Sequence, residues 1–285
     1  MLEASFELLD ERQPAWGRVA VLPWDTEIFG FPVAAWQPGE AEAIAADRGA
    51  FRTRFEAWAG AGRIELVACT VVADDRAWQA VLPELGFTFV EQTVRIALRV
   101  QAFEAPAPST PVRLATPDDG PALDEIASHA FRHGRYHADP RFPRALADDR
   151  YQYWVRSTFR STDPRDRVYV LGRPGTVKGF FQLQLNEDRA EVGIIAVPKA
   201  LQGSRAGADL VAGTQLALKA DGVRWITSKV SAANVGLISL VASYGYRFRQ
   251  PEATFHWHAP TAPHLLPRGT IPPEGDQFRR PSTSG

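Results

Sequence analysis

The sequence has little cysteine, no long apolar run and no excess of charge of one sign. Its single cysteine, Cys69, excludes an intrachain disulfide and any zinc module built on several cysteines. No stretch approaches the roughly 20 consecutive apolar residues that a membrane-spanning helix needs. The 32 Lys and Arg residues are balanced by 33 Asp and Glu residues, which leaves no basic excess to neutralise a phosphate backbone. We therefore expect neither a membrane protein nor a nucleic-acid-binding protein.

The overall composition is typical of a globular chain. The 285 residues are 45% hydrophobic and 23% charged, and this length allows one large or two modest domains. The first residues, MLEASFELLD, lack the basic and then apolar pattern of a signal peptide. Together with the low cysteine content, this favours a cytoplasmic location. The pattern leaves the oligomeric state open, a homodimer included.

Two changes in composition divide the sequence. Residues 101–111, QAFEAPAPSTP, interrupt an alternating strand pattern and predict a linker. Beyond His258, repeated prolines break every helix or central strand, which predicts a disordered, proline-rich tail over residues 259–285. The sequence therefore predicts a first domain over residues 1–100 and a second over residues 112–258.

Helical and strand patterns alternate in both domains, which indicates the α/β class with a mixed sheet. In the first domain we expect strands at 17–24, 64–72 and 87–98 and helices at 40–58 and 74–85. In the second we expect helices at 118–131 and 144–159, a hairpin from 167 to 186, a strand at 191–197, a helix at 205–221, a strand at 225–230, a helix at 234–244 and a last strand ending at 257. The similar stretches Leu85-Gly86-Phe87 and Tyr244-Gly245-Tyr246 each join a helix to a strand, either as a common turn or because the halves are related.

The most informative stretch joins the strand at 191–197 to the helix at 205–221. Its small residues Gly203, Ala206 and Gly207 would let a ligand approach the backbone closely. Unpaired amides at a helix start, together with the helix dipole, favour a bound anion such as a pyrophosphate. The pattern is neither a P-loop, nor a Rossmann fingerprint, nor a nucleophile elbow. Simple packing of small side chains is the alternative.

This stretch resembles the acetyl-CoA binding motif of the GNAT acyltransferases, Gln/Arg-x-x-Gly-x-Gly/Ala. Gln202, Gly203 and Gly207 carry the match, whereas Arg205 stands where the motif has its middle glycine. The order of elements from 112 to 258 is also similar to that superfamily, which implies a GNAT acyltransferase fold there. The resemblance implies an acetyl-CoA site made by Ile195, Ala196, Val197, Gln202, Gly203, Ser204, Arg205, Ala206, Gly207, Ala208 and Asn234.

Three further segments resemble the TDP-fucosamine acetyltransferase family. They are Leu22 to Pro32, Leu85 to Glu91, and Arg135 to Phe142 ahead of Tyr153-Trp154. Members of that family pair a degenerate α/β amino-terminal domain with a GNAT domain. The resemblance implies direct transfer of an acetyl group from acetyl-CoA to the amine of a nucleotide-linked amino sugar, bound between the domains.

Attack of an amine on a thioester needs a base, donors for the developing oxyanion, and a proton for the thiolate. Glu91 matches the family position of the base, and burial beside Phe89-Val90 would raise its pKa; an exposed strand-edge carboxylate is the alternative. The oxyanion donors would be backbone amides of Ile195 to Val197. Val241 stands where the family has a tyrosine that protonates the thiolate, so the candidate donors are Tyr244, Ser239, Ser243 and solvent.

Several residues are candidates for the acceptor site. Trp24 and Phe29 would form an aromatic platform or pack in the core, and Arg135 would pair with a diphosphate or with nearby acids. We expect His137 and Asp139 to lie in a loop that lines the acceptor site. Histidines recur at His129, His133 and His137, and His256 and His258 share a strand face, but such surface histidines are common and we predict no metal site.

Two other functions stay open. Arg205 and Val241 depart from the motifs that they interrupt, so an acyl-CoA-binding module without turnover is one alternative. N-acyl transfer to a small amine that is not a sugar is the other.

Overall fold

The structure is a computed structural model that describes residues 4–102, 104 and 106–260. Most of the predicted tail, residues 261–285, lies outside the described residues. The strands are β1 (Glu7–Leu8), β2 (Arg18–Val21), β3 (Val33–Gln37), β4 (Leu66–Val72), β5 (Thr88–Arg99), β6 (Val112–Leu114), β7 (Asp166–Leu171), β8 (Phe180–Asn186), β9 (Arg189–Ala196), β10 (Trp225–Ser231) and β11 (Arg247–His258). The α-helices are α1 (Pro23–Phe29), α2 (Ala41–Ala46), α3 (Arg48–Ala61), α4 (Arg76–Glu84), α5 (Gly120–Ala130), α6 (Arg135–Ala138), α7 (Arg144–Phe159), α8 (Ala206–Ala220) and α9 (Val235–Ser243).

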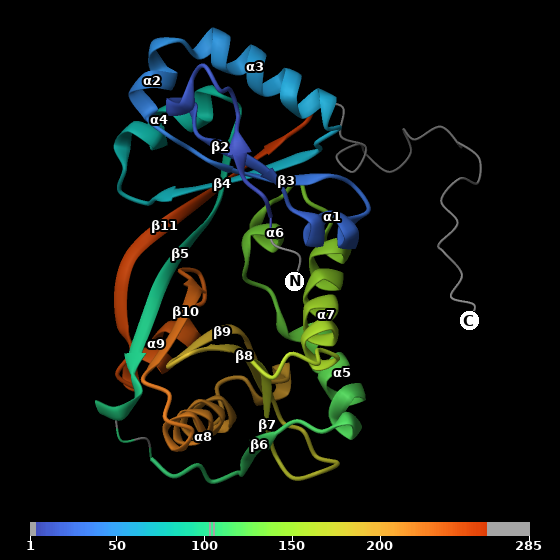
Figure 1. Cartoon of the computed structure of the whole chain (residues 1–285). Coiled ribbons are helices and arrows are strands. Elements are labelled where there is room, and N and C mark those ends of the chain that lie inside the picture. The colour runs from blue at the N-terminus through green and yellow to red at the C-terminus, as the bar shows by residue number, and fades with distance from the viewer. Residues whose placement is uncertain (1–3, 103, 105, 261–285) are drawn as a thin grey trace, which may run out of the picture.

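These 11 strands form one mixed sheet in the order β1-β2-β3-β4-β11-β5-β10-β9-β8-β7-β6 (Figure 1). We call β1 to β5 with their helices the first half and β6 to β11 with theirs the second half. Strand β11 returns from the second half to lie between β4 and β5, antiparallel to both. The pairs β3–β4 and β9–β10 are parallel. The predicted α/β class with a mixed sheet is therefore confirmed, and one sheet runs through both halves.

Helices cover both faces of this sheet. On one face, α2, α3 and α4 pack over the first half around Trp36, and α8 and α9 pack over the second half around Leu210. On the other face, α1 and α6 pack on the first half around Leu66, and α5 packs on the second half around Phe180.

Helix α7 belongs to both cores of that second face. Ala147 near its start is buried in the core of the first half, and Val155 near its end is buried in the core of the second half. Figure 1 shows α7 running from the region of α1 and α6 down to α5. The helix therefore spans the interval between the two cores.

The predicted helix at 40–58 is two helices. Asp47 separates α2 from α3, and its carboxylate accepts a hydrogen bond from the Ala50 amide at 3.1 Å. A short acidic side chain favours such a cap over a helix interior, because it satisfies an amide that the helix leaves unpaired. The hairpin of β7 and β8 forms as predicted.

The two similar helix-to-strand junctions have the same geometry. Gly86 follows α4 with φ +86°, and Gly245 follows α9 with φ +78°. Both values lie in the left-handed region that ends helices and that glycine adopts without strain. The prediction that these glycines end helices is confirmed.

The predicted linker is tied to the second half. The buried carboxylate of Asp209 in α8 accepts hydrogen bonds from the amides of Ser109 and Thr110, both at 3.1 Å, and from the Ser109 hydroxyl. This end of the linker is therefore fixed against α8. Among the described residues, no helix combines the length and apolarity that crossing a membrane would require.

Candidate active site between the two halves

A polar interval separates the two cores on the face of the sheet that α7 covers. Adjacent strands from β4 to β7 each place a polar side chain there: Thr70, Thr254, Glu91, Ser231, Glu191, Gln182 and Asp166. These residues share one face because directly paired residues on neighbouring strands point the same way, as in Thr70–Thr254–Glu91. Together with residues of α6 and α7 they line a cavity of about 510 Å³. Covered sheet faces are usually apolar, so this polar lining indicates a binding surface.

The cavity reaches the sheet at the place where β9 and β10 part. Their parallel ladder stops at the pair Val192–Ser228, after which β10 continues beside β5 and β9 continues to Ala196. A small hollow of about 50 Å³ lies at this parting, and Ile195 lines both it and the cavity. The end of the ladder leaves backbone groups of β9 available to a ligand.

A bulge at Gly193 shapes the same segment. Gln182 of β8 pairs with Ile194 and Leu183 pairs with Val192, so Gly193 has no partner of its own. A Cβ atom on Gly193 would lie only 2.8 Å from the ring of Trp154 in α7. Glycine therefore lets the strand approach this ring closely.

Helix α8 begins beyond β9 with small residues, among them Ala206 and Gly207. Gly203 has φ +77°, and a Cβ atom there would meet no atom within 4 Å, so open space lies over the backbone. The Ser204 hydroxyl accepts a hydrogen bond from the Ala206 amide at 3.2 Å. The Arg205 guanidinium turns to Asp209, at 3.2 Å one turn along the helix. The backbone before α8 is therefore open at Gly203, and the Arg205 side chain is engaged by Asp209.

Glu91 lies in the cavity, on β5, next to Ser231 of β10 and the backbone of Arg135. Burial raises the pKa of Glu91, although hydrogen bonds from Ser231 and the Arg135 amide and the charge of Arg135 oppose this shift. A carboxylate whose pKa is raised toward neutrality is suited to take up a proton.

On the helix side of the cavity, the buried carboxylate of Asp25 in α1 bonds residues of α6 and α7. Its carboxylate accepts hydrogen bonds from Tyr136 at 2.6 Å, Arg135 at 3.0 Å and Arg150 at 2.7 Å. Burial alone would raise the pKa of Asp25, but the two arginines hold it below the ordinary value. The Arg150 guanidinium also lies 4.7 Å from the ring centre of Trp24. Asp25 and Trp24 thus position Arg135, Tyr136 and Arg150, which line the cavity.

The structure brings together only part of the predicted acceptor site. Arg135 lines the cavity and Trp24 supports it, but Phe29 is buried among Phe31, Tyr136 and Phe142 in the core. His137 is bonded to Asp148 at 2.9 Å and is not among the lining residues.

Asp139 lies in a buried cluster against β11 and not in the cavity lining. Its carboxylate is 2.7 Å from His256 Nδ1 and 2.7 Å from His258 Nε2. Burial lowers the pKa of His256 to about 4, so its neutral ring donates to Asp139. The donor atoms of the three residues lie within 4.8 Å of one another and could hold a metal ion. Ligands of one zinc ion lie more than 3 Å apart, so the 2.7 Å separations describe hydrogen bonds.

Of the residues predicted to bind acetyl-CoA or to protonate its thiolate, only some line the cavity. Asn234 lines the cavity, and its side chain also caps α9 by accepting from the Leu237 amide at 3.1 Å. Ala196 is paired with Phe180 of β8. Tyr244 is not among the cavity-lining residues, and its hydroxyl donates to the Ala208 carbonyl at 3.2 Å.

Sequence reasoning missed Asp25, Arg150, Trp154, Gln182 and Glu191. Two signals could have found some of them. In α7, Ala147, Tyr151, Trp154 and Thr158 recur at helical spacing and face the sheet. In β8, the alternation of Gln182 and Gln184 with leucines places amides on one face of the strand. Nothing in the sequence indicates that Asp25 meets residues more than 100 positions away.

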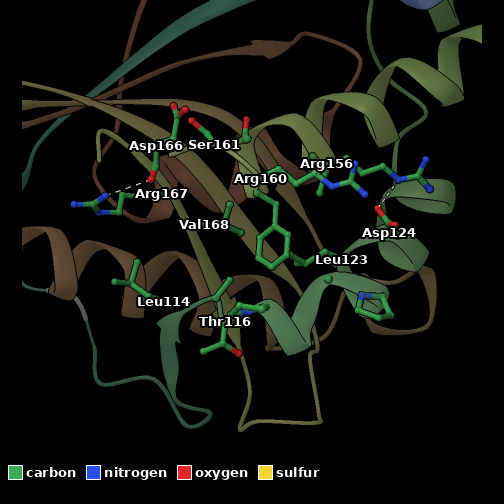
Figure 2. Close-up of a pocket in the computed structure, with 17 residues that line it drawn as sticks. Leu114, Thr116, Leu123, Asp124, Arg156, Arg160, Ser161, Asp166, Arg167 and Val168 are labelled. Carbon is green, nitrogen blue, oxygen red and sulfur yellow. Dashed lines mark hydrogen bonds and ion pairs between the residues drawn. The ribbon is translucent and has the colours of Figure 1, made fainter. Parts of the chain in front are cut away.

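A second hollow, of about 780 Å³, lies beyond the end of α7, against β7 and α5. Figure 2 shows Arg156 and Arg160 on one side of it and Arg167 on the other, with Arg156 bonded to Asp124 at 2.9 Å. Thr158 and Asp166 line both this hollow and the cavity. The two spaces are therefore neighbours across these side chains.

Comparison with known proteins identifies the fold. The structure matches a GCN5-related N-acetyltransferase from Sphaerobacter thermophilus with a TM-score of 0.62 and 17% sequence identity, over 85% of this chain and 76% of that one. A GCN5-related N-acetyltransferase from Kribbella flavida gives 0.55 and 14%, over 84% and 86% of the two chains. A tandem GNAT protein from the clavulanic acid biosynthesis pathway gives 0.55 and 17%, over 86% and 80%. No family model and no curated protein matches the sequence. The chain has the GNAT fold, as predicted.

Proposed function

We propose that the protein is an N-acetyltransferase that moves the acetyl group of acetyl-CoA to the amine of a nucleotide-linked amino sugar. The observation that carries this proposal is the parting of β9 and β10 beside a polar cavity that contains the buried carboxylate of Glu91. The GNAT fold and the resemblance of separate segments to the TDP-fucosamine acetyltransferase family support the donor and the acceptor, respectively.

The residues of the second half fit the donor. The open backbone around Gly203 and the start of α8 can accept the pyrophosphate of the coenzyme, because the first amides of a helix have no acceptor within it. We assign this role to residues 202–208. The segment around Ile195, with Asn234 opposite, would then hold the thioester at the parting of the strands.

The first half supplies the base. The neutral acceptor amine attacks the thioester carbonyl, and its nitrogen lone pair forms the new N–C bond. As this bond forms, the nitrogen gives one proton to Glu91, directly or through water. Backbone amides of β9 near Ile195 donate to the developing oxyanion. The C–S bond then breaks with its electron pair on sulfur.

The departing thiolate takes its proton from solvent in this proposal. Val241 is buried in the core and carries no proton to give. Burial raises the pKa of Tyr244, and its hydroxyl is already bonded to the Ala208 carbonyl. Tyr244 therefore connects the end of α9 to α8 through this hydrogen bond.

The lack of a proton donor for the thiolate at Val241 and Tyr244 favours a second function. With Val241 and an engaged Tyr244, the chain would bind acyl-CoA as a module without turnover. Transfer to a small amine that is not a sugar is a third outcome of the same experiment.

The test is steady-state release of free thiol from acetyl-CoA with amino sugar nucleotides, free amino sugars and simple amines. Turnover that requires the nucleotide-linked sugar supports the proposal, and turnover that ignores the nucleotide supports the small-amine reaction. Saturable binding of acetyl-CoA with no turnover on any amine supports the binding module. Absence of acetyl-CoA binding in calorimetry contradicts all three.

A further inference from the structure

One end of the cavity is lined by carboxylates and amides. We call Asp166 of β7, Gln182 and Gln184 of β8, and Glu191 of β9 the carboxylate–amide end. Asp166 pairs with Gln184 and Gln184 pairs with Glu191, so their side chains lie in a row on one face. Gln182 is on the same face, two residues along β8.

Gln182 is the buried member of this group, with only 3% of its surface exposed. Its side-chain nitrogen donates to the Thr158 hydroxyl, but its carbonyl oxygen Oε1 has no partner among the described residues. A buried polar atom without a partner costs stability, and most such atoms in folded proteins are satisfied. The free oxygen therefore marks a place where a bound molecule donates a hydrogen bond.

The charges of the lining favour a donor that is not an anion. Asp166 and Glu191 are acidic, and the lining cations are already engaged: Arg135 and Arg150 with Asp25, and Lys229 with Glu252 at 2.7 Å. A phosphate or carboxylate at this end would face two carboxylates without a free lining arginine or lysine. Hydroxyl groups would find acceptors on three strands.

An aromatic ring borders the same end. Trp154 lies against β9 at Gly193, which is paired on neither side within the bulge. A ring beside side chains that accept hydrogen bonds suits a sugar, because a pyranose has an apolar C–H face and a rim of hydroxyls. A simple alkyl amine whose one nitrogen lies at the thioester has no further group to donate to these acceptors.

We infer that the carboxylate–amide end binds the ring hydroxyls of the sugar acceptor, with Gln182 as a specificity-determining residue. This inference rests on the proposed function, because it assumes that the cavity receives the acceptor. It adds which end of the cavity distinguishes a sugar from other amines, and it excludes an anionic group from that end.

The test uses Gln182→Leu and two matched amines, D-glucosamine and cyclohexylamine, which share a six-membered ring with one amine but differ in hydroxyls. We expect kcat/KM for D-glucosamine to fall about tenfold or more, because loss of the acceptor leaves a sugar hydroxyl without its hydrogen bond. We expect kcat/KM for cyclohexylamine to be unchanged or higher. The control is Gln215→Leu, which replaces an equally buried glutamine on α8 outside the cavity lining and leaves the ratio unchanged. An unchanged ratio in Gln182→Leu overturns the inference.

A second variant covers misfolding of Gln182→Leu. The Glu191 side chain is exposed, so we expect Glu191→Gln to retain the fold. We expect it to raise activity on D-glucosamine 6-phosphate relative to D-glucosamine, because one repelling carboxylate is gone; no change in that ratio contradicts the inference.

Binding separates this inference from the proposed function. If wild-type protein turns over neither amine, calorimetry with desulfo-CoA, which lacks the thiol, measures their affinities. A preference for D-glucosamine that Gln182→Leu abolishes supports the inference although the proposed function fails. Binding without preference, or no binding, overturns it.

Discussion

Each half of the sheet contains one parallel crossover, and the two crossovers end differently. In the first half, β3 stays paired with β4 as far as Trp36–Cys69, which leaves only Gln37 at the end of β3. In the second half, β9 leaves β10 at Val192 and continues to Ala196. The first crossover is therefore closed along its length, and the second is open at the point where the cavity reaches the sheet.

The two halves also differ in which side chains bond the first amides of their helices. In the first half, the Asp47 carboxylate occupies the start of α3, and the Asp75 carboxylate accepts from the Ala77 and Trp78 amides at the start of α4. Among the described residues, no acidic side chain accepts from the first amides of α8: Asp209 in its first turn accepts from the Ser109 and Thr110 amides instead, and the Ser204 hydroxyl accepts from the Ala206 amide. A carboxylate thus fills the start of α3 and of α4 in the first half, whereas none fills the start of α8, the candidate anion site.

The largest expected effect tests whether the first half, which contains the closed crossover, also supplies the catalytic base. Replacing Glu91 on β5 of the first half removes the proposed base, so Glu91→Gln is expected to lower kcat by about 10²–10⁴-fold. Because burial raises the pKa of Glu91, the wild-type acid limb of kcat/KM lies above the ordinary glutamate range, with activity rising as the carboxyl loses its proton. This limb disappears in the variant.

The control is Glu252→Gln, which changes a carboxylate on the neighbouring strand β11 that is paired with Arg95 and Lys229. We expect a change in rate of only a few-fold and an unchanged acid limb. Equal losses in both variants, or a wild-type pH profile in Glu91→Gln, would remove Glu91 from the mechanism and reduce the first half to a scaffold.

A smaller effect is expected where the first half only positions side chains. Asp25→Asn removes the charge that holds Arg135 and Arg150, and breaking such a buried pair costs about 3–5 kcal/mol of unfolding free energy. The charge of Arg135 then lowers the pKa of Glu91 without compensation by Asp25, so the acid limb moves to lower pH. KM for the amine rises, whereas KM for acetyl-CoA is unchanged because α8 is untouched.

Denaturant unfolding and pH profiles of kcat/KM measure these changes. Asp119→Asn is the matched control, since Asp119 is an equally buried partner of an arginine, Arg113, and lies outside the cavity lining. It is expected to destabilise the fold without moving the acid limb. A shift of the limb in both variants would assign the effect to lost stability.

Much of the fold could be predicted because its signals are local. The alternation around β7 and β8 and the glycines at 86 and 245 depend on neighbouring residues, and the structure confirms them. The insertion of β11 between β4 and β5 could not be predicted, because it depends on pairs such as Phe255–Cys69 that lie far apart in sequence. Periodicity gives the faces of a strand but not its neighbours.

The site divides along the same line. Gly203 and Glu91 stand in segments with their own sequence signal, and the structure places one at an open helix start and the other in the cavity. Phe29 and Trp24 lie in one short motif, yet Phe29 packs in the core and Trp24 packs on Arg150. Their separate surroundings come from α6 and α7, which the motif itself does not encode. The same holds for Asp139, whose partners are on β11.

The smallest expected effect comes from closing the open crossover itself. Ser204→Asp would place a carboxylate at the start of α8, as Asp47 does at α3, and a favourable cap with the helix dipole stabilises by about 1 kcal/mol. The same charge would repel the pyrophosphate, so we expect the Kd for acetyl-CoA in calorimetry to rise about tenfold while the melting temperature is unchanged or higher, a combination that damage to the fold cannot produce. The reciprocal variant Asp47→Ser should cost up to about 1 kcal/mol and leave the Kd unchanged. If Ser204→Asp binds acetyl-CoA as tightly as the wild type does, the start of α8 is not the anion site. The open crossover would then not be explained by pyrophosphate binding.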